Sequence, residues 1–227
     1  MEWKDDIFVA FRIGLASVRA NLLPMAVLWL LAVLLITVYS YVPAFAEAME
    51  PVRRWQIENG WRGPFLNRVF FCGLLPGVFL CTCPSLRPRY VFVVIACESV
   101  WNGLLGIAGD WSFRVLNDIF GNGVDIGTLV GKALADQFVW TVLFIAPANA
   151  IFHFWIGRGF SFRRTYAEWP RHFYRELVAP NLVSNWCVWF PVQLTVFMFP
   201  LDLQIHMNGL VCAFWTLLCL QIGRRTK

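Results

Sequence analysis

The chain has 227 residues, of which 59% are hydrophobic and only 15% are charged, whereas a soluble domain carries about 25% charged residues. This shortage of charge excludes disorder, a coiled coil and a disulfide-stapled miniprotein, and the 12 tryptophans favour a protein that meets the membrane–water interface. The net charge of +5 comes from basic residues in short polar segments between apolar ones, which is typical of membrane topology signals and not of a nucleic-acid-binding surface.

The first apolar stretch covers residues 22–42 and holds no charged residue. At a rise of about 1.5 Å per residue, it is long enough to cross a hydrocarbon core about 30 Å thick. Residues 7–19 before it place apolar side chains at helical spacing, which predicts an amphipathic helix at the interface. A cleavable signal peptide is an alternative, because Ala44-Phe45-Ala46 resembles a cleavage site, although the apolar stretch is longer than usual.

Five further apolar stretches predict an all-α, polytopic transmembrane bundle of about six spans. They cover residues 69–83, 90–109, 132–157, 177–200 and 203–222. The first of the five is short and contains Pro76, so it is either a kinked span or a re-entrant segment. The last two are separated only by a tight turn, which predicts an antiparallel hairpin. Polar connections are expected at residues 43–68, 110–127 and 158–176.

The distribution of Lys and Arg predicts the orientation of these spans. Six spans place both termini on one side of the membrane, and 13 of the 19 basic residues fall on that side. Because positive charge is retained inside, we expect both termini in the cytoplasm or its organelle equivalent. If residues 69–83 do not cross the membrane, the number of spans is odd and the two termini lie on opposite sides.

Three charged positions lie within the predicted spans and need a partner in protein or water. Glu98 sits inside the third span, and Asn102, four residues later on the same helix face, is a possible hydrogen-bond partner. Lys132 and Asp136 have the same spacing in the fourth span, where they could pair, and Gln137 follows. These groups are compatible with a polar lumen and also with hydrogen-bonded packing between helices.

Three amide side chains lie on one face of the predicted fifth span. At 100° per residue, Asn181, Asn185 and Gln193 point within about 120° of one another. Amides that face lipid would be unsatisfied, so this face should look into the bundle. Pro147 and Pro191 should bend their helices. The bends leave room for a wet crevice or for interhelical hydrogen bonds in a solid bundle.

The sequence offers no specific sign of catalysis or of a cofactor. The three histidines are scattered, and no nucleophile stands at a defined spacing from a base. We therefore expect no enzyme, no metal and no cofactor. The seven cysteines are expected to be small buried hydrophobic residues, with Cys81-Thr82-Cys83 as an alternative metal or redox pair. A basic segment, Arg158 to Arg175, is the one feature that would support a lipid enzyme, and it is more typical of a topology determinant or an anionic-lipid contact.

Several short motifs occur in a fixed order between residues 87 and 222. They are Arg87-Pro88-Arg89, Trp111-Ser112-Phe113-Arg114-Val115-Leu116-Asn117-Asp118, Lys132 with Asp136-Gln137, and Asn185-Trp186 with Trp189 and Pro191-Val192-Gln193, followed by Phe197, Pro200 and Trp215. In this order they resemble the Mpv-seventeen / peroxisomal-membrane-protein-twenty-two family of small integral membrane proteins. Phe190 stands where that family usually has a proline, and Gln204 where it has an arginine. The resemblance divides the chain into residues 1–86, with the amphipathic helix and one or two spans, and a family-like membrane core, residues 87–227.

The resemblance implies a compact helical bundle in a mitochondrial inner, peroxisomal or bacterial cytoplasmic membrane. Some members of the family look like weakly selective channels for ions or small metabolites. Lys132, Asp136, Asn185 and Gln193 match motif positions of the family, whereas Glu98 is an inference from this sequence alone. We therefore expect a weakly selective channel or solute pathway. Its expected partners are the lipid bilayer, small solutes or ions, and a second copy of the chain, but no nucleic acid. The alternative is a structural membrane protein without a conducting lumen.

Overall fold

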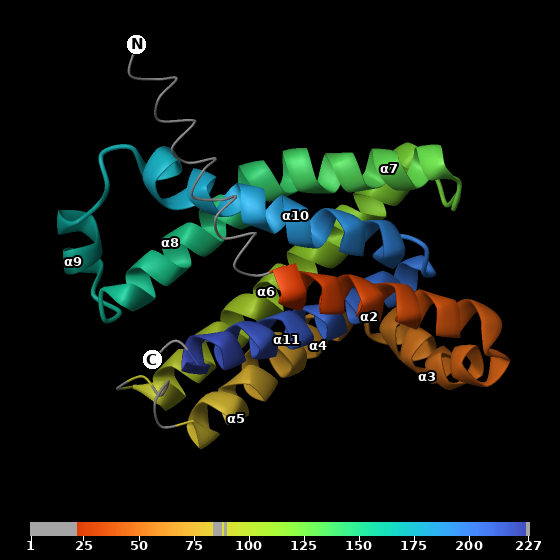
Figure 1. Ribbon diagram of the computed structural model, residues 1–227, viewed down its shortest axis with the longest axis horizontal. Coiled ribbons are helices and arrows are strands. Elements are labelled where there is room, and N and C mark those ends of the chain that lie inside the picture. Colours follow the sequence, from red (N-terminus) through yellow and green to blue (C-terminus); the bar gives the residue numbers. More distant parts are fainter. Residues whose placement is uncertain (1–21, 84–87, 89, 226–227) are drawn as a thin grey trace, which may run out of the picture.

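The computed structural model describes residues 22–83, 88 and 90–225 of the chain. These residues form helices joined by short turns, and the described part of the chain holds no strand, which confirms the all-α prediction (Figure 1). The amphipathic helix predicted at 7–19 lies outside the described residues.

The elements follow one another with few breaks, and three of them, labelled η, are π-helical. In chain order they are α2 (Leu22–Tyr41), α3 (Pro43–Asn59), α4 (Arg62–Arg68), η1 (Val69–Leu74), α5 (Leu75–Thr82), α6 (Val91–Phe120), α7 (Ile126–Ala135), η2 (Asp136–Ile145), α8 (Ala146–Gly157), α9 (Phe162–Ala167), η3 (Tyr174–Val178), α10 (Ala179–Val196) and α11 (Leu201–Arg225).

Four continuous helical stretches in the described part of the chain are long and apolar enough to cross a membrane. They are Leu22–Tyr41, Arg62–Thr82, Val91–Phe120 and Ile126–Gly157. The chain is therefore described as an integral membrane protein, but the predicted number of about six spans is not confirmed. The two helices that account for the difference are α10 and α11, which carry amides and a histidine.

Two predicted connections differ from the structure. Residues 43–68 were expected to be a polar connection, but α3 fills most of them and α4 begins the next span at Arg62. That span is longer than predicted because Arg68 turns to a polar partner inside the bundle instead of marking a loop. Residues 110–127 were also expected to be a connection, but α6 continues to Phe120. An ion pair of 2.8 Å between Asp110 and Arg114, four residues apart, accommodates both charges on the helix.

Each of the three π-helical segments ends two residues before a proline. Pro76 follows η1, Pro147 follows η2 and Pro180 follows η3. A proline lacks a backbone N–H and its ring clashes with the carbonyl four residues back, so a local widening of the helix relieves the conflict. The predicted disturbance at Pro147 is thus present as a π-helical stretch of 10 residues, whereas Pro191 lies within the α-helical α10.

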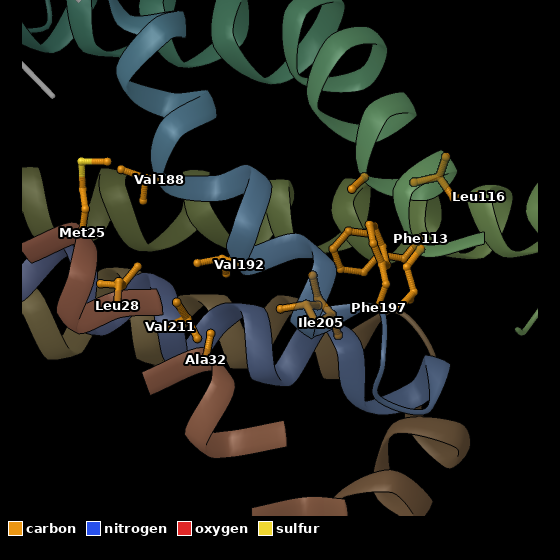
Figure 2. Packing of buried hydrophobic residues seen from close by; sticks show 13 residues of the cluster. Met25, Leu28, Ala32, Phe113, Leu116, Val188, Val192, Phe197, Ile205 and Val211 are labelled. Atoms are coloured by element: carbon orange, nitrogen blue, oxygen red, sulfur yellow. The ribbon is translucent and has the colours of Figure 1, made fainter. Parts of the chain in front are cut away.

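The main core lies where α2, α6, α10 and α11 meet (Figure 2). It is built from Met25, Leu28 and Ala32 of α2, Phe113 and Leu116 of α6, Val188 and Val192 of α10, Phe197 after α10, and Ile205 and Val211 of α11, among others. Residues 203–209 of α11 are buried without interruption, so the first half of this helix is enclosed by its neighbours. This half of the helix need not be apolar all round, because protein surrounds it. This explains why α11 is the most polar of the long helices near the centre.

Small residues let α6 approach the second span closely. A Cβ added to Gly73 of η1 would come within 2.5 Å of the Cα of Ser99, and Gly103 of α6 faces Phe65 and Val69 in the same way. The spacing of Gly73 and Gly77, and that of Ser99 and Gly103, therefore mark a helix contact.

Candidate functional site

Asp136 is the centre of a buried hydrogen-bond network. It begins η2, and only 3% of the residue is exposed. Its carboxylate Oδ2 accepts hydrogen bonds from Nε2 of Gln137, 2.6 Å away, and from Nε2 of Gln193 on α10, 2.8 Å away. Hydrogen bonds to a carboxylate offset part of the cost of removing it from water. Two sequence-predicted positions on one helix thus meet a third on another.

The network continues from Gln193 to the second span. Oε1 of Gln193 accepts a hydrogen bond of 3.0 Å from Nδ2 of Asn208 on α11. The Asn208 side-chain oxygen in turn accepts a hydrogen bond from the guanidinium of Arg68 at the end of α4, which also donates to Sγ of Cys72, 3.4 Å away. Residues 140 positions apart in the sequence are joined in this way.

A second branch leads from Gln137 to the first half of α10. Nδ2 of Asn185 donates to Oε1 of Gln137 over 3.2 Å, and the indole N–H of Trp186 donates to the Gln137 backbone carbonyl over 2.9 Å. We call the six residues of both branches the polar chain: Arg68, Asn208, Gln193, Asp136, Gln137 and Asn185. Each amide in it donates in the direction of Asp136, so the bonds polarise one another in the same sense.

Lys132 does not join Asp136, although the sequence suggested that the two could pair. Its ammonium group donates to Oδ1 of Asn117 on α6, 3.2 Å away, and only 2% of the residue is exposed. The physical reason lies in the backbone. The helix changes from α to π at Asp136, and a π turn takes more than four residues, so the i and i+4 side chains no longer share a face.

Glu98 lies on α6 and pairs with α8. Its Oε1 is 3.3 Å from Nδ1 of His153, and Nδ2 of Asn102 donates to its Oε2 over 3.4 Å, so the predicted partner is in place. One turn along, the indole N–H of Trp101 donates to Oδ1 of Asn149 over 2.9 Å. Glu98 is therefore separate from the hydrogen bonds of the polar chain, and its partners come from α6 and α8.

The three amides predicted to share one face of the fifth span have different roles. Asn185 and Gln193 belong to the polar chain. Asn181 is exposed at the start of α10, and its Nδ2 bonds the carbonyl of Leu177 in the preceding turn, 3.0 Å away. It takes no part in the polar chain.

Two adjoining cavities bring these groups together. The larger has a volume of about 530 Å³, is partly open to the surroundings, and has Arg68, Glu98, Asp136, Asn185, Gln193 and Asn208 among its polar lining residues. The second, of about 420 Å³, lies between the η2–α8 stretch and the η3–α10 stretch and is lined by Asn181 among others. The two cavities adjoin, because they share the lining residues Thr141, Ile145, Asn149, His153 and Asn185. Seven of the eight sequence-predicted polar residues line one of them, and Lys132 does not.

The sequence did not point to four residues of this site. Arg68, Asn149, His153 and Asn208 line the larger cavity and bond to the predicted residues or their neighbours. A signal existed for Asn208, because Gln204, His206 and Asn208 interrupt an otherwise apolar stretch. In the part of the chain that the structure describes, no group of three His, Cys, Asp or Glu side chains is placed to hold a metal ion.

Comparison of the chain with protein-family models, with curated proteins and with solved structures finds no significant match.

Proposed function

We propose that this protein provides a weakly selective pathway for ions or small polar solutes across a membrane. The observation that carries the proposal is the pair of adjoining cavities, which run past the polar chain between helices that are apolar outside. Polar and ionisable groups inside a membrane are costly unless protein or water meets them, and they commonly mark a solute path. Amides and few charges suit weak binding, which conduction requires.

The lining favours cations over anions. Among the charged residues of the larger cavity, Glu98 and Asp136 are acidic and Arg68 is basic, and Arg68 is engaged by Asn208. A low-dielectric cavity with excess negative charge raises the local concentration of cations. These fixed charges and the width of the cavity would determine which solutes pass, and they would select only weakly among them.

Flux into liposomes tests the proposal. The full chain is reconstituted into vesicles, and the release of K⁺, Cl⁻ and a small neutral sugar is followed at several salt concentrations and membrane potentials. We expect release in excess of protein-free vesicles, with K⁺ ahead of Cl⁻. If folded protein produces no flux under any of these conditions, the pathway proposal is wrong.

A structural role without a lumen is the second candidate, and one observation favours it. Every amide of the polar chain has a protein partner, which is how packing contacts between helices are satisfied. Under this proposal the polar chain holds α4, α10, α11 and η2 together. Vesicles would then be tight, and the same substitutions that break the polar chain would unfold the protein.

The proposed pathway runs across a mitochondrial inner, peroxisomal or bacterial cytoplasmic membrane, as the family resemblance implies. We propose that both termini lie inside. Four spans, like six, place the termini on one side, and the same 13 of 19 basic residues fall there. Tags at either end should be reached by protease only after the vesicle or organelle membrane is opened.

A further inference from the structure

The segment that follows the last candidate span folds back against that span. α8 ends at Gly157, and the next residues turn with Gly159 and Phe160 both at positive φ. The Phe160 backbone N–H donates to the carbonyl of Trp155 over 3.2 Å, and its ring meets the Trp155 ring edge-on at 5.1 Å. A bulky residue adopts positive φ only when its surroundings hold it there. The turn is therefore fixed, and it leads the chain back along α8.

Aromatic contacts keep this segment beside the end of α8. The Phe162 ring stacks on Trp155 at 5.3 Å, and the Trp169 ring stands against Phe154 at 5.9 Å. The Arg158 guanidinium lies 4.3 Å over the Phe154 ring and forms an ion pair with Glu168. Figure 1 shows α9 close to the end of α8 and away from the other helices. The segment is thus an ordered part of the fold and belongs to the end of a span.

Its outer surface combines large aromatic side chains with arginines. Phe162 is 77% exposed and Tyr166, one helical turn later, is 88% exposed. Arg163 and Arg164 lie between them on α9 and are exposed, as is Arg171 after the helix. Glu168 is taken by Arg158, and Glu176, the next acidic residue, accepts a hydrogen bond of 3.0 Å from the backbone N–H of His172. Arg163 and Arg164 on α9 therefore have no other acidic side chain within residues 158–175. We call Phe162, Arg163, Arg164, Tyr166 and Arg171 the basic–aromatic surface.

We propose that the basic–aromatic surface binds the headgroups of anionic phospholipids at the end of the Ile126–Gly157 span. Exposed aromatic rings beside a span are suited to the region between hydrocarbon and water, where a ring is half wet. Arginine forks bind phosphate oxygens bidentately, and a cluster of them next to a span attracts an anionic leaflet. The occupant is a lipid and not a soluble anion, since exposed aromatic rings and arginines occur together on one short helix, which folds back beside the end of a membrane-spanning one. This inference is independent of solute conduction.

Native mass spectrometry of the full chain tests it. Detergent-solubilised protein is titrated with phosphatidylglycerol or phosphatidylcholine, and the bound lipids are counted. We expect phosphatidylglycerol to be retained in preference. The double variant R163Q/R164Q should weaken that binding about 25-fold, at about five-fold for each arginine near an anionic surface. The matched control is R53Q/R54Q, which also removes two charges, but from arginines that already pair with Glu50 on α3. This control should retain phosphatidylglycerol as the unmodified chain does.

Three outcomes would overturn the proposal. Equal retention of both lipids by the unmodified chain would remove the headgroup preference. If R163Q/R164Q and R53Q/R54Q weakened the binding of phosphatidylglycerol equally, the effect would come from the net charge of the protein and not from this surface. Displacement of the lipid by inorganic phosphate at matched concentration would make the site one for free anions. Arg54, Arg163 and Arg164 are exposed, whereas Arg53 is half-buried and its Nε also lies 3.9 Å from Asp202. Unchanged helical circular dichroism verifies that both variants are folded. The variant F162A/Y166A should lower the retention of both lipids, because it removes the apolar part of the surface.

Discussion

Arg68 and Asp136 form the two ends of one hydrogen-bonded path, joined through the amides of Asn208 and Gln193. Arg68 lies close enough to act electrostatically on Asp136, yet no direct ion pair joins them. The two amides lie between the opposite charges, and both donate their hydrogen bonds toward Asp136, so the ions are linked without touching. The cation of the second span and the anion of the fourth are thus held by two helices, α10 and α11, that do not themselves count as candidate spans.

This path predicts that Arg68 and Asp136 are energetically coupled. Asp136→Asn leaves the donors of Gln137 and Gln193 without an anion, and Arg68→Gln leaves Asn208 without its donor. We expect each single substitution to cost about 1–3 kcal/mol of unfolding free energy, because it leaves buried polar groups unsatisfied. The double variant should cost less than the sum, since neither charge is then left alone. Unfolding in mixed micelles measures the three values, and strict additivity would show that the ends of the path do not interact.

A second prediction separates a lumen from packing. Asn185 links α10 to Gln137, and it lines both cavities. In a conducting pathway, Asn185→Leu together with Glu98→Gln should yield folded protein whose K⁺ flux is altered several-fold. In a solid bundle, the same pair should lower stability without any flux to change. The control is Asn59→Leu, which removes an amide that bonds only the Trp55 carbonyl on α3, outside both cavities. Flux and thermal unfolding of all three proteins are compared, and an effect of Asn59→Leu equal to that of the double variant would contradict both interpretations.

The sequence predicted much of this site because its residues carry their own signal. A charge or an amide inside an apolar stretch must face protein or water, so Glu98, Asp136, Asn185 and Gln193 could be identified one at a time. Their partners could not, because pairing depends on which helices are neighbours. Arg68 and Asn208 are 140 positions apart in the sequence, and no local pattern around either residue predicts that they pair. Arg68 also lies at the edge of the predicted span, where an arginine usually indicates a loop.

The same reasoning applies to the difference between the predicted spans and the candidate spans of the structure. Apolar length identifies a helix but does not distinguish a lipid-facing helix from one enclosed by others. α11 is enclosed over residues 203–209, so its apolar character comes from core packing. The i, i+4 rule suggested a pair between Lys132 and Asp136, and the rule fails where the helix widens. That widening was foreseeable only as a disturbance near Pro147, not as a π segment that begins 11 residues earlier.

The close approach of α6 to the second span predicts strong intolerance of side chains at Gly73. A Cβ there would come within 2.5 Å of the Ser99 Cα, which is backbone and cannot rotate away. Gly73→Val should therefore destabilise the protein by about 1–3 kcal/mol or more through overpacking. The control is Gly157→Val at the end of α8, where a Cβ would meet nothing within 4 Å. Unfolding midpoints of both variants give the comparison, and similar losses at the two glycines would contradict a tight contact at Gly73.

We expect the stability of the protein to depend on pH through Asp125, at the start of the fourth span. Its carboxylate caps α7, and hydrogen bonds from the hydroxyl and backbone N–H of Thr128 hold the pKa of Asp125 below its usual range. The stabilisation is complete above the pKa of Asp125 in the unfolded chain and is lost as the pH falls through the lowered folded pKa. Asp125→Ala should therefore be less stable than the unmodified chain near neutral pH, and the gap should close in acid. Asp125→Asn keeps a capping oxygen but does not titrate, so it should lack this pH dependence. Thermal unfolding across pH measures it, and a gap that widens in acid would be the opposite of what the cap requires.

The last prediction concerns access of water to α10. Asn185 and Gln193 line the larger cavity, whereas Val192 is fully buried in the core between them. In a chain whose native cysteines are replaced by serine or alanine, cysteines introduced at positions 185 and 193 should react with a membrane-impermeant, water-soluble thiol reagent. A cysteine at position 192 should react at least ten-fold more slowly, as should one at 188 on the same buried side. Labelling rates in sealed vesicles give the order directly. If position 192 reacts as fast as 185, then the helix is exposed by general loosening, and the cavity is not a defined water path.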